Sequence, residues 1–312
     1  MHIPFDELEP NAQGAVQKTC AQIAGLGAPE DVTVRQLAGG ITNRNFRLTG
    51  PSADVVLRVH GNDTALLGID RHAEHASALQ AAGLGLAPGV AGVVDPELYL
   101  ITEFVEAEAA DLHAPDTLHT AVSLLRRWHE SSAISNRFDT FGLAETYALR
   151  ASFLGVRIPA EVETAVELST TIGAVFAAFD DAAVPCHNDL LAANFLASTE
   201  DPRRVWLIDW EYAGMNTRWF DLGNLSINNG LTDEANEMLL LSYFGSVTPQ
   251  RRACLELMRV MSDVREAMWG VVQQGISSLD FDYGDYARQH FQRMMINATR
   301  SEFRTALQNA AG

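Results

Sequence analysis

Two different hydrophobic patterns divide the chain, and this division is the strongest constraint on its fold. Between residues 32 and 102, the runs VTVRQL, NRNFRLTG, DVVLRVHG and ELYLIT carry the alternating or β-branched character that is typical of strands. After residue 113 the pattern predicts helices, at 117–132, 160–180, 233–244 and 250–275. We therefore expect an α+β chain with a small antiparallel sheet first and a larger, mainly helical part second.

Other segments complete this outline. An amphipathic stretch lies at 11–25, and one helix is predicted at 70–82, where Gly83 and then Pro88 follow it. A strand-like pair, VPCHNDLLAANFLAS and RVWLIDWEY, interrupts the helical part. Since no repeat or low-complexity segment occurs, we expect one compact unit of two lobes. Their predicted bounds are 1–102 for the N-terminal lobe, 103–107 for a hinge and 108–312 for the C-terminal lobe.

The charge and the apolar runs limit the partners. Apolar runs are far shorter than the ~20 residues that span a bilayer, and the acidic N-terminus is unlike a signal peptide. We therefore expect a cytoplasmic protein without membrane insertion. A net charge of −18 argues against nucleic acid and is compatible either with a cationic substrate or simply with solubility. The three cysteines lack CxxC spacing, which predicts buried thiols and neither disulfides nor a zinc cluster.

The segment HNDLLAAN, His187 to Asn194, carries the strongest chemical signal, together with Asp209 in LIDWEY. Phosphoryl transfer needs a carboxylate that orients and deprotonates the attacking hydroxyl, and hard oxygen ligands that hold Mg²⁺. Asp189 would supply the first, and Asn194 and Asp209 the second. Polar residues that merely cap turns are the alternative, but side chains embedded between VPC, FL and VWLI need a reason to be half-buried.

A second set of residues suggests a nucleotide site. The turn GGITN offers backbone N–H groups that could cover phosphates, although a glycine pair is also common in ordinary hairpins. Arg58 is a basic residue in an otherwise apolar strand, and Glu74 on the following helix is its natural partner; a surface arginine is the alternative. Lys18 is the only lysine, so a GK[ST] phosphate loop is excluded, and no GxGxxG fingerprint occurs.

These motifs together resemble the choline/ethanolamine kinase family, within the wider group that includes aminoglycoside phosphotransferases. The resemblance runs from about Val34 to Phe291 and rests on GGITN, VVLRVHG, CHNDLLAANFL, IDWEYAGMNTRWFDLGN and WGVVQQGISSLDFDYGDYARQHF. It implies a bilobal protein-kinase-like fold, ATP and Mg²⁺ as cofactors, and transfer of the γ-phosphoryl group to the hydroxyl of a small amino alcohol, choline or ethanolamine.

The resemblance also implies residue roles. The phosphates would lie under Gly39, Gly40, Thr42 and Asn43 and beside Arg58, the adenine near Glu103 to Val105, and His187 would brace the catalytic loop. Glu211 would assist the metal or the substrate cation. The cationic substrate would meet Tyr212, Trp269 and Tyr286, with Phe281 and Tyr283 nearby.

Two departures from the family pattern make this cage less aromatic. Glu266 stands where the family usually has a Trp, and Asn228 where we expect an acid. From helical periodicity alone, Trp269 and Glu266 lie on the flank of the apolar stripe Leu257, Met261, Val264, Met268 and Val272, which also fits a core-edge Trp beside a solvated Glu.

Three functions remain open at this stage. An amino alcohol kinase is favoured. A phosphotransferase for an aminoglycoside or a sugar is the alternative within the same chemistry, and a catalytically silent nucleotide-binding module is the alternative outside it. The acceptor and the oligomeric state stay open, with a homodimer among the options.

Overall fold

The strand-rich part of the chain forms one antiparallel sheet of six strands, four of which the sequence predicts. The computed structural model describes residues 2–37, 42–61, 63–179, 181–201 and 203–310. The strands, in the spatial order β1-β2-β3-β4-β6-β5, are β1 His2–Ile3, β2 Thr33–Gln36, β3 Asn43–Thr49, β4 Asp54–His60, β5 Val90–Val94 and β6 Tyr99–Glu103. β1 and β5 were not predicted, because β1 has two residues and β5 carries a register shift at Gly92.

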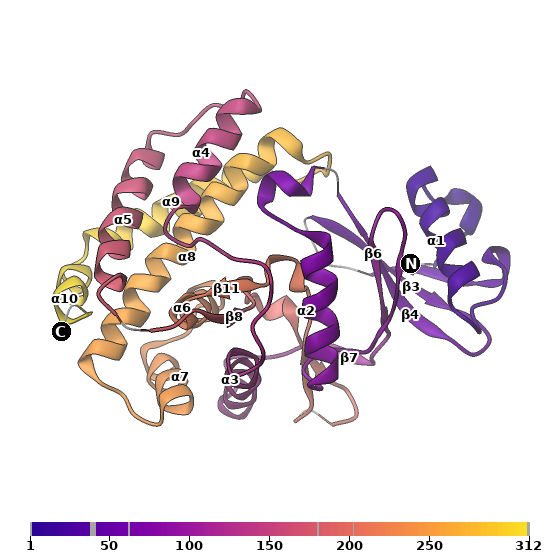
Figure 1. Cartoon of the computed structure of the whole chain (residues 1–312), viewed down its shortest axis with the longest axis horizontal. Helices are drawn as coiled ribbons and strands as arrows, with labels where there is room; N and C mark the ends of the chain where they lie inside the picture. Colours follow the sequence, from indigo (N-terminus) through magenta and orange to yellow (C-terminus); the bar gives the residue numbers. More distant parts are fainter. Residues whose placement is uncertain (1, 38–41, 62, 180, 202, 311–312) are drawn as a thin grey trace.

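The two faces of this sheet pack against different helices, because successive side chains of a strand point to opposite sides. Ile101 lies in the apolar core that the sheet shares with α1 (Pro10–Gln22), whereas its neighbour Leu100 lies in the core of the second lobe. The helix α2 (Arg71–Gly83) contributes Ala78 and Ala81 to that second core. In Figure 1, α2 accordingly stands between the sheet and the helical lobe.

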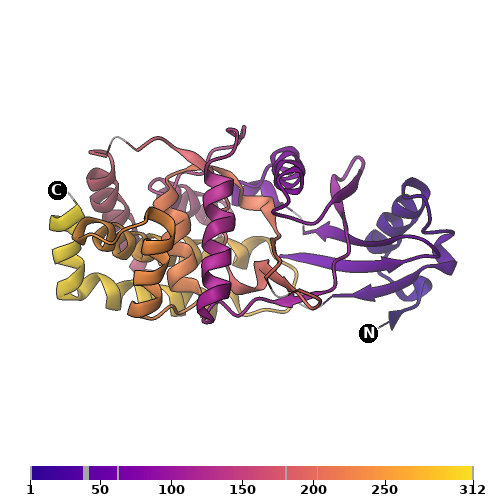
Figure 2. The same cartoon turned by 90° about the horizontal axis from the view of Figure 1, so that it is seen from below.

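The C-terminal lobe is mainly helical and contains short strands near the interface with the sheet lobe (Figures 1 and 2). Its helices are α3 Pro115–His129, α4 Leu143–Phe153, α5 Glu161–Phe176, α6 Arg218–Asn228, α7 Asp233–Phe244, α8 Pro249–Ile276, α9 Tyr283–Thr299 and α10 Ser301–Ala310. Its strands form a sheet of order β10-β9-β7 and a pair of β11 with β8: β7 Ala107–Ala109, β8 Val184–Cys186, β9 Phe195–Ser198, β10 Val205–Leu207 and β11 Gly214–Asn216. Single 3-10 turns complete the chain: η1 Phe5–Glu7, η2 Pro29–Asp31, η3 Thr64–Leu67, η4 Ala192–Asn194 and η5 Trp210–Tyr212.

The long helix α8 is the centre of this lobe, and it packs against α4, α6, α9 and α10. It is buried almost continuously from Ala253 to Gln273, so the single apolar stripe predicted for 257–272 understates its burial. One glycine allows α6 to approach closely: a Cβ atom at Gly223 would lie 2.5 Å from the backbone carbon of Met258. This contact fixes α6 against α8.

The chain crosses between the lobes after β6. Glu103 ends β6 in the large sheet, and Ala107 begins β7, which pairs with β9 of the other lobe. Figure 2 shows the sheet and the helical lobe at opposite ends of the molecule, with one terminus in each. No helix within the described residues is long and apolar enough to cross a bilayer.

Candidate active site

The loop His187 to Asn194 leaves β8 with an unusual backbone conformation. Asn188 has a φ of +66°, in the left-handed region that Asn tolerates better than most residues. Its side chain secures this conformation, because Nδ2 donates to the carbonyl oxygen of Tyr212 at 2.9 Å and Oδ1 accepts from Asn216 at 2.8 Å. The loop is thereby fixed to the segment that follows Asp209.

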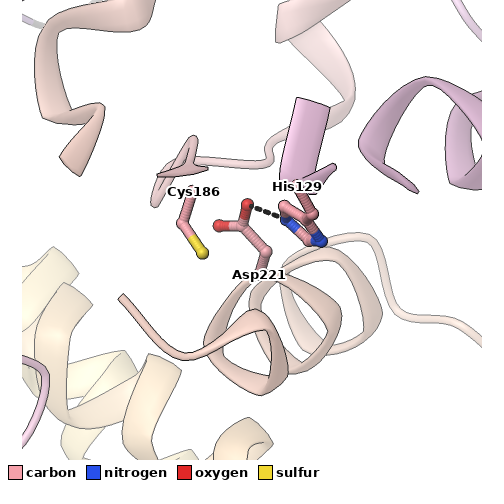
Figure 3. Close-up of side chains that lie close together, drawn as sticks. All are labelled: His129, Cys186 and Asp221. Atoms are coloured by element: carbon pink, nitrogen blue, oxygen red, sulfur yellow. Dashed lines mark hydrogen bonds and ion pairs between the residues drawn. The ribbon is translucent and has the colours of Figure 1, made fainter. Parts of the chain in front are cut away.

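Asp221 of α6 binds the backbone of the same loop. Its two carboxylate oxygens accept the backbone N–H groups of Asn188 at 2.7 Å and His187 at 2.8 Å, and Nε2 of His129 donates to it at 2.9 Å. Figure 3 shows His129 and Asp221 side by side with Cys186. No role is predicted for His129 or Asp221 from the sequence, although Asp221 lies in the motif IDWEYAGMNTRWFDLGN.

His129, Cys186 and Asp221 have a spacing that could also suggest a metal site. The two nitrogens of His129 are already engaged, because Nδ1 pairs with the Tyr243 hydroxyl at 2.6 Å. Burial raises the pKa of the Cys186 thiol well above its usual range, whereas a metal needs the thiolate. We therefore interpret this cluster as a support for the loop from His187 to Asn194. Of the cysteines, Cys186 and Cys254 are buried as predicted, but Cys20 is only half-buried.

His187 is a neutral structural side chain. Its Nε2 donates to the carbonyl oxygen of Ile208 at 3.0 Å, its Nδ1 accepts the backbone N–H of Asp189 at 3.3 Å, and its ring packs edge-on against Trp210. Burial lowers the pKa of His187 to about 4. The ring thus joins the loop that carries Asp189 to the loop that carries Asp209.

Asn194 and Asp209 lie at the same end of the β9–β10 hairpin. Asn194 directly precedes β9, Asp209 closely follows β10, and the backbone N–H of Ile208 donates to the carbonyl oxygen of Asn194 at 2.9 Å. Nδ2 of Asn194 donates to the carbonyl oxygen of Asp189 at 2.8 Å, which leaves Oδ1 as the atom that could meet a cation. An amide oxygen and a carboxylate are hard donors, and this pair therefore fits Mg²⁺.

Asp189 is almost fully buried, and a cation that the sequence analysis missed lies beside it. Nη1 of Arg265, on α8, is 3.1 Å from Oδ1 of Asp189. Burial raises the pKa of the Asp189 carboxyl to about 7, against the opposing effect of Arg265. The signal that could have revealed Arg265 is the charged pair in DVREAMWG, inside an otherwise apolar helix.

A buried ionic network surrounds Arg58, on β4. Arg58 is paired with Asp209, its Nη2 is 3.4 Å from Glu211, and its Nε is 3.7 Å from Oε1 of Glu74, its predicted partner. Burial disfavours the charge of Arg58, but the three carboxylates outweigh this effect and raise its pKa. Burial likewise raises the pKa of Asp209 to about 6, although Arg58 opposes the shift.

Arg71, for which the sequence predicts no role, is a further member of this network. Its Nη1 donates to Glu74 at 2.6 Å and to Glu211 at 3.0 Å, and Nδ2 of Asn43 donates to the same Glu211 oxygen at 3.0 Å. Burial would raise the pKa of Glu211, yet Arg58 and Arg71 together lower it.

The aromatic residues predicted for the substrate also come together. Trp269 packs edge-on against Tyr283 and Tyr286, and its indole N–H donates to the Tyr212 hydroxyl at 2.8 Å. Phe281 contacts Tyr283 and Tyr286 from a more exposed position.

The two residues that depart from the family pattern are hydrogen-bonded to each other. Nδ2 of Asn228 donates to Oε1 of Glu266 at 2.9 Å, and the Tyr286 hydroxyl donates to Oε2 at 2.8 Å. The Glu266 side chain is only 1% exposed, so a solvated Glu is excluded.

The remaining predicted residues lie around these. Thr42 directly precedes β3 and Asn43 begins it, whereas Gly39 and Gly40 lie outside the described residues. Glu103 is exposed at the end of β6, where its N–H donates to the carbonyl oxygen of Gly89 at 2.7 Å, and Val105 is half-buried between the lobes.

This fold and this cluster define the class of phosphotransferases with two lobes. A sequence profile described as "Phosphotransferase enzyme family" matches residues 33–256, and the chain belongs to this family. Mouse ethanolamine kinase 2 is 26% identical in an alignment that covers 85% of this chain and 76% of that protein.

Solved structures agree. A choline/ethanolamine kinase family protein from Mesorhizobium loti has a TM-score of 0.79 and 28% identity, and the match covers 96% of this chain and 99% of the other. The choline kinase LicA from Streptococcus pneumoniae has a TM-score of 0.77 at 22% identity, covering 92% and 98%, which shows the shared fold. The predicted kinase-like fold and the resemblance to choline/ethanolamine kinases are confirmed. The chain is a small-molecule kinase.

Proposed function

We propose that this enzyme transfers the γ-phosphoryl group of Mg·ATP to the hydroxyl of a small amino alcohol, with choline and ethanolamine as the first acceptors to test. The proposal rests on one observation: hydrogen bonds connect the loop of Asp189 and Asn194 to the loop of Asp209. Asn194 bonds to the backbone of Asp189, and Ile208, which directly precedes Asp209, bonds to both Asn194 and His187. Phosphoryl transfer depends mainly on such positioning and on charge.

The roles of the chain's residues follow from their chemistry. Asn194 and Asp209 would hold Mg²⁺, which when bound neutralises the phosphate charge. Asp189 would orient the acceptor hydroxyl and accept its proton. A raised pKa, about 7, suits a base that exchanges protons near neutral pH.

The nucleotide would lie between the lobes, whose proposed bounds are 1–102 and 108–312 with a hinge at 103–107. Arg58 and Arg71 face this region. Nε and Nη2 of Arg71 have no hydrogen-bond partner within the described part of the chain, which favours an anionic ligand such as a phosphate group. Glu103 to Val105 stay our prediction for the adenine contact, and Gly39 to Asn43 for the phosphate loop.

A coupled ADP-release assay tests the function. Purified protein with Mg·ATP is screened against choline, ethanolamine, other amino alcohols, sugars and aminoglycosides. We expect acceptor-dependent ADP release that EDTA abolishes. Turnover with aminoglycosides or sugars but with no amino alcohol would contradict the proposed acceptor and favour the alternative acceptor class. Nucleotide binding without transfer to any acceptor would favour a catalytically silent nucleotide-binding module.

A further inference from the structure

Arg265 places a fixed positive charge in the acceptor part of the site. Its side chain is only 4% exposed, and its Nη1 contacts both Oδ1 of Asp189 at 3.1 Å and Oε2 of Glu266 at 2.8 Å. Its Cζ lies 4.4 Å from the centre of the Tyr212 ring. The guanidinium therefore lies between the proposed base and the aromatic residues of the substrate segment.

The other edge of this guanidinium has no hydrogen-bond partner among the described residues. Nε and Nη2 of Arg265 are buried and have no hydrogen-bond partner among the residues that the structure describes. These two nitrogens form one side of the planar group, and such a side binds a carboxylate through two parallel hydrogen bonds. Because buried donors without partners are costly, this edge favours a ligand with oxygen acceptors.

A quaternary ammonium group fits these surroundings poorly. It has no hydrogen-bond acceptor, and it is bound mainly through aromatic faces. Tyr212 was expected to offer such a face, but the Arg265 guanidinium already lies over its ring. Glu266 already accepts hydrogen bonds from Arg265, Asn228 and Tyr286.

The ion pairs of Arg265 connect it to the acceptor side of the site. The network that faces the nucleotide region has its own cations, Arg58 and Arg71, which pair with Glu74 and Glu211. Arg265 pairs with neither of these carboxylates, but with Asp189 and Glu266. The anion that it would bind therefore belongs to the acceptor rather than to ATP.

We propose that Arg265 is a specificity-determining residue and that the preferred acceptor is a hydroxylated amine that also carries a carboxylate, as in a hydroxy amino acid. This inference rests on the proposed kinase function and narrows its substrate class. The carboxylate binds side-on to Nε and Nη2 of Arg265, and the hydroxyl points to Asp189.

Matched acceptor pairs test the inference. Serine differs from ethanolamine, and homoserine from 3-aminopropanol, by one carboxylate. We expect the wild-type kcat/KM to be at least about 10-fold higher for the carboxylated member of one pair. In Arg265→Met and Arg265→Lys, this ratio should fall by about 10- to 100-fold, mainly through KM, because neither side chain provides the two-donor edge.

The ratio of the two kcat/KM values within a pair distinguishes recognition of the carboxylate from a general effect on Asp189, which would lower both values equally. Arg259→Met, which removes an arginine paired with Glu256 on the same helix, is the control and should keep the wild-type ratio. A wild-type preference for the uncarboxylated acceptors, or equal losses for both members of each pair in the Arg265 variants, would overturn the inference.

Binding of the carboxylated acceptors, measured by calorimetry, tests the role of Arg265 independently of turnover. Serine and homoserine should bind the wild-type protein in the presence of Mg²⁺ and a non-hydrolysable ATP analogue, and Arg265→Met should weaken this binding by about 10-fold or more. If no acceptor is phosphorylated but this binding depends on Arg265, the proposed function fails, and Arg265 keeps its role as the residue that binds the carboxylate. If neither compound binds in an Arg265-dependent way, the inference fails whatever the turnover.

Discussion

Asp221 accepts the backbone N–H of Asn188 at 2.7 Å, and this bond stabilises the left-handed conformation of Asn188 in the loop that carries Asp189. In Asp221→Asn, one of the two oxygens becomes an amide nitrogen that cannot accept. We expect kcat to fall by about 10- to 1000-fold through misplacement of Asp189, with little change in the Kd for Mg·ATP.

Asp263→Asn is the matched control, since Asp263 is also fully buried but pairs with Arg293 and His290. Both variants should lose thermal stability, and only Asp221→Asn should lose most of its kcat. Equal kcat values in the two folded variants would remove Asp221 from the positioning role.

Asp189→Ala removes the proposed base. We expect acceptor-dependent ADP release to fall to background, because no other carboxylate would orient the hydroxyl at this position. Nucleotide binding, measured by calorimetry with Mg·ATP, should survive within about threefold. Retained turnover would exclude Asp189 as the base.

Asp209→Ala should change how nucleotide binding depends on metal. In the wild type Asp209 pairs with Arg58, and the variant loses a metal ligand while it frees this arginine. We expect Mg²⁺ to strengthen ATP binding to the wild type but to improve binding to the variant by less than about threefold. Titrations of ATP with and without EDTA measure this difference, and an unchanged metal effect would contradict the ligand assignment.

Asp189→Asn should stabilise the metal-free protein at high pH. The folded-state pKa of Asp189 is raised from 3.8 to about 7, so the native state holds this proton more tightly than the unfolded chain. Its contribution to stability is therefore lost as the pH rises through this window. The neutral Asn does not lose this stability. The free energy of unfolding of Asp189→Asn, relative to that of the wild type, should therefore increase by about 1 to 3 kcal/mol between pH 4 and pH 8.

Urea unfolding in EDTA at these two pH values measures this difference. Asp6→Asn is the control, because this side chain is exposed in the folded protein. If the difference in unfolding free energy between Asp189→Asn and the wild type is the same at both pH values, the pKa of the Asp189 carboxyl is not raised in the folded protein.

The sequence predicted the fold order well, because strand alternation and long helical runs are local signals. It missed α4, α6, α9 and α10. In α6, polar residues such as Asp221 and Asn224 are buried and disturb the apolar pattern. Their burial is compensated by bonds to the backbone of the catalytic loop, which no local pattern reveals.

The candidate site was predicted where motifs carry it, at Asp189, Asn194 and Asp209. Arg265 and Arg71 were missed because their partners, Asp189 and Glu211, are far away in sequence. The buried pairing of Glu266 with Asn228 also depends on the approach of α6 to α8, which only the folded chain provides.

The most direct test of the proposed site is a crystal structure with Mn²⁺ and a non-hydrolysable ATP analogue. Anomalous scattering should place the ion within about 2.3 Å of a carboxylate oxygen of Asp209 and of Oδ1 of Asn194, beside the nucleotide phosphates. An ion bound elsewhere, with both side chains turned away from the phosphates, would contradict the assignment.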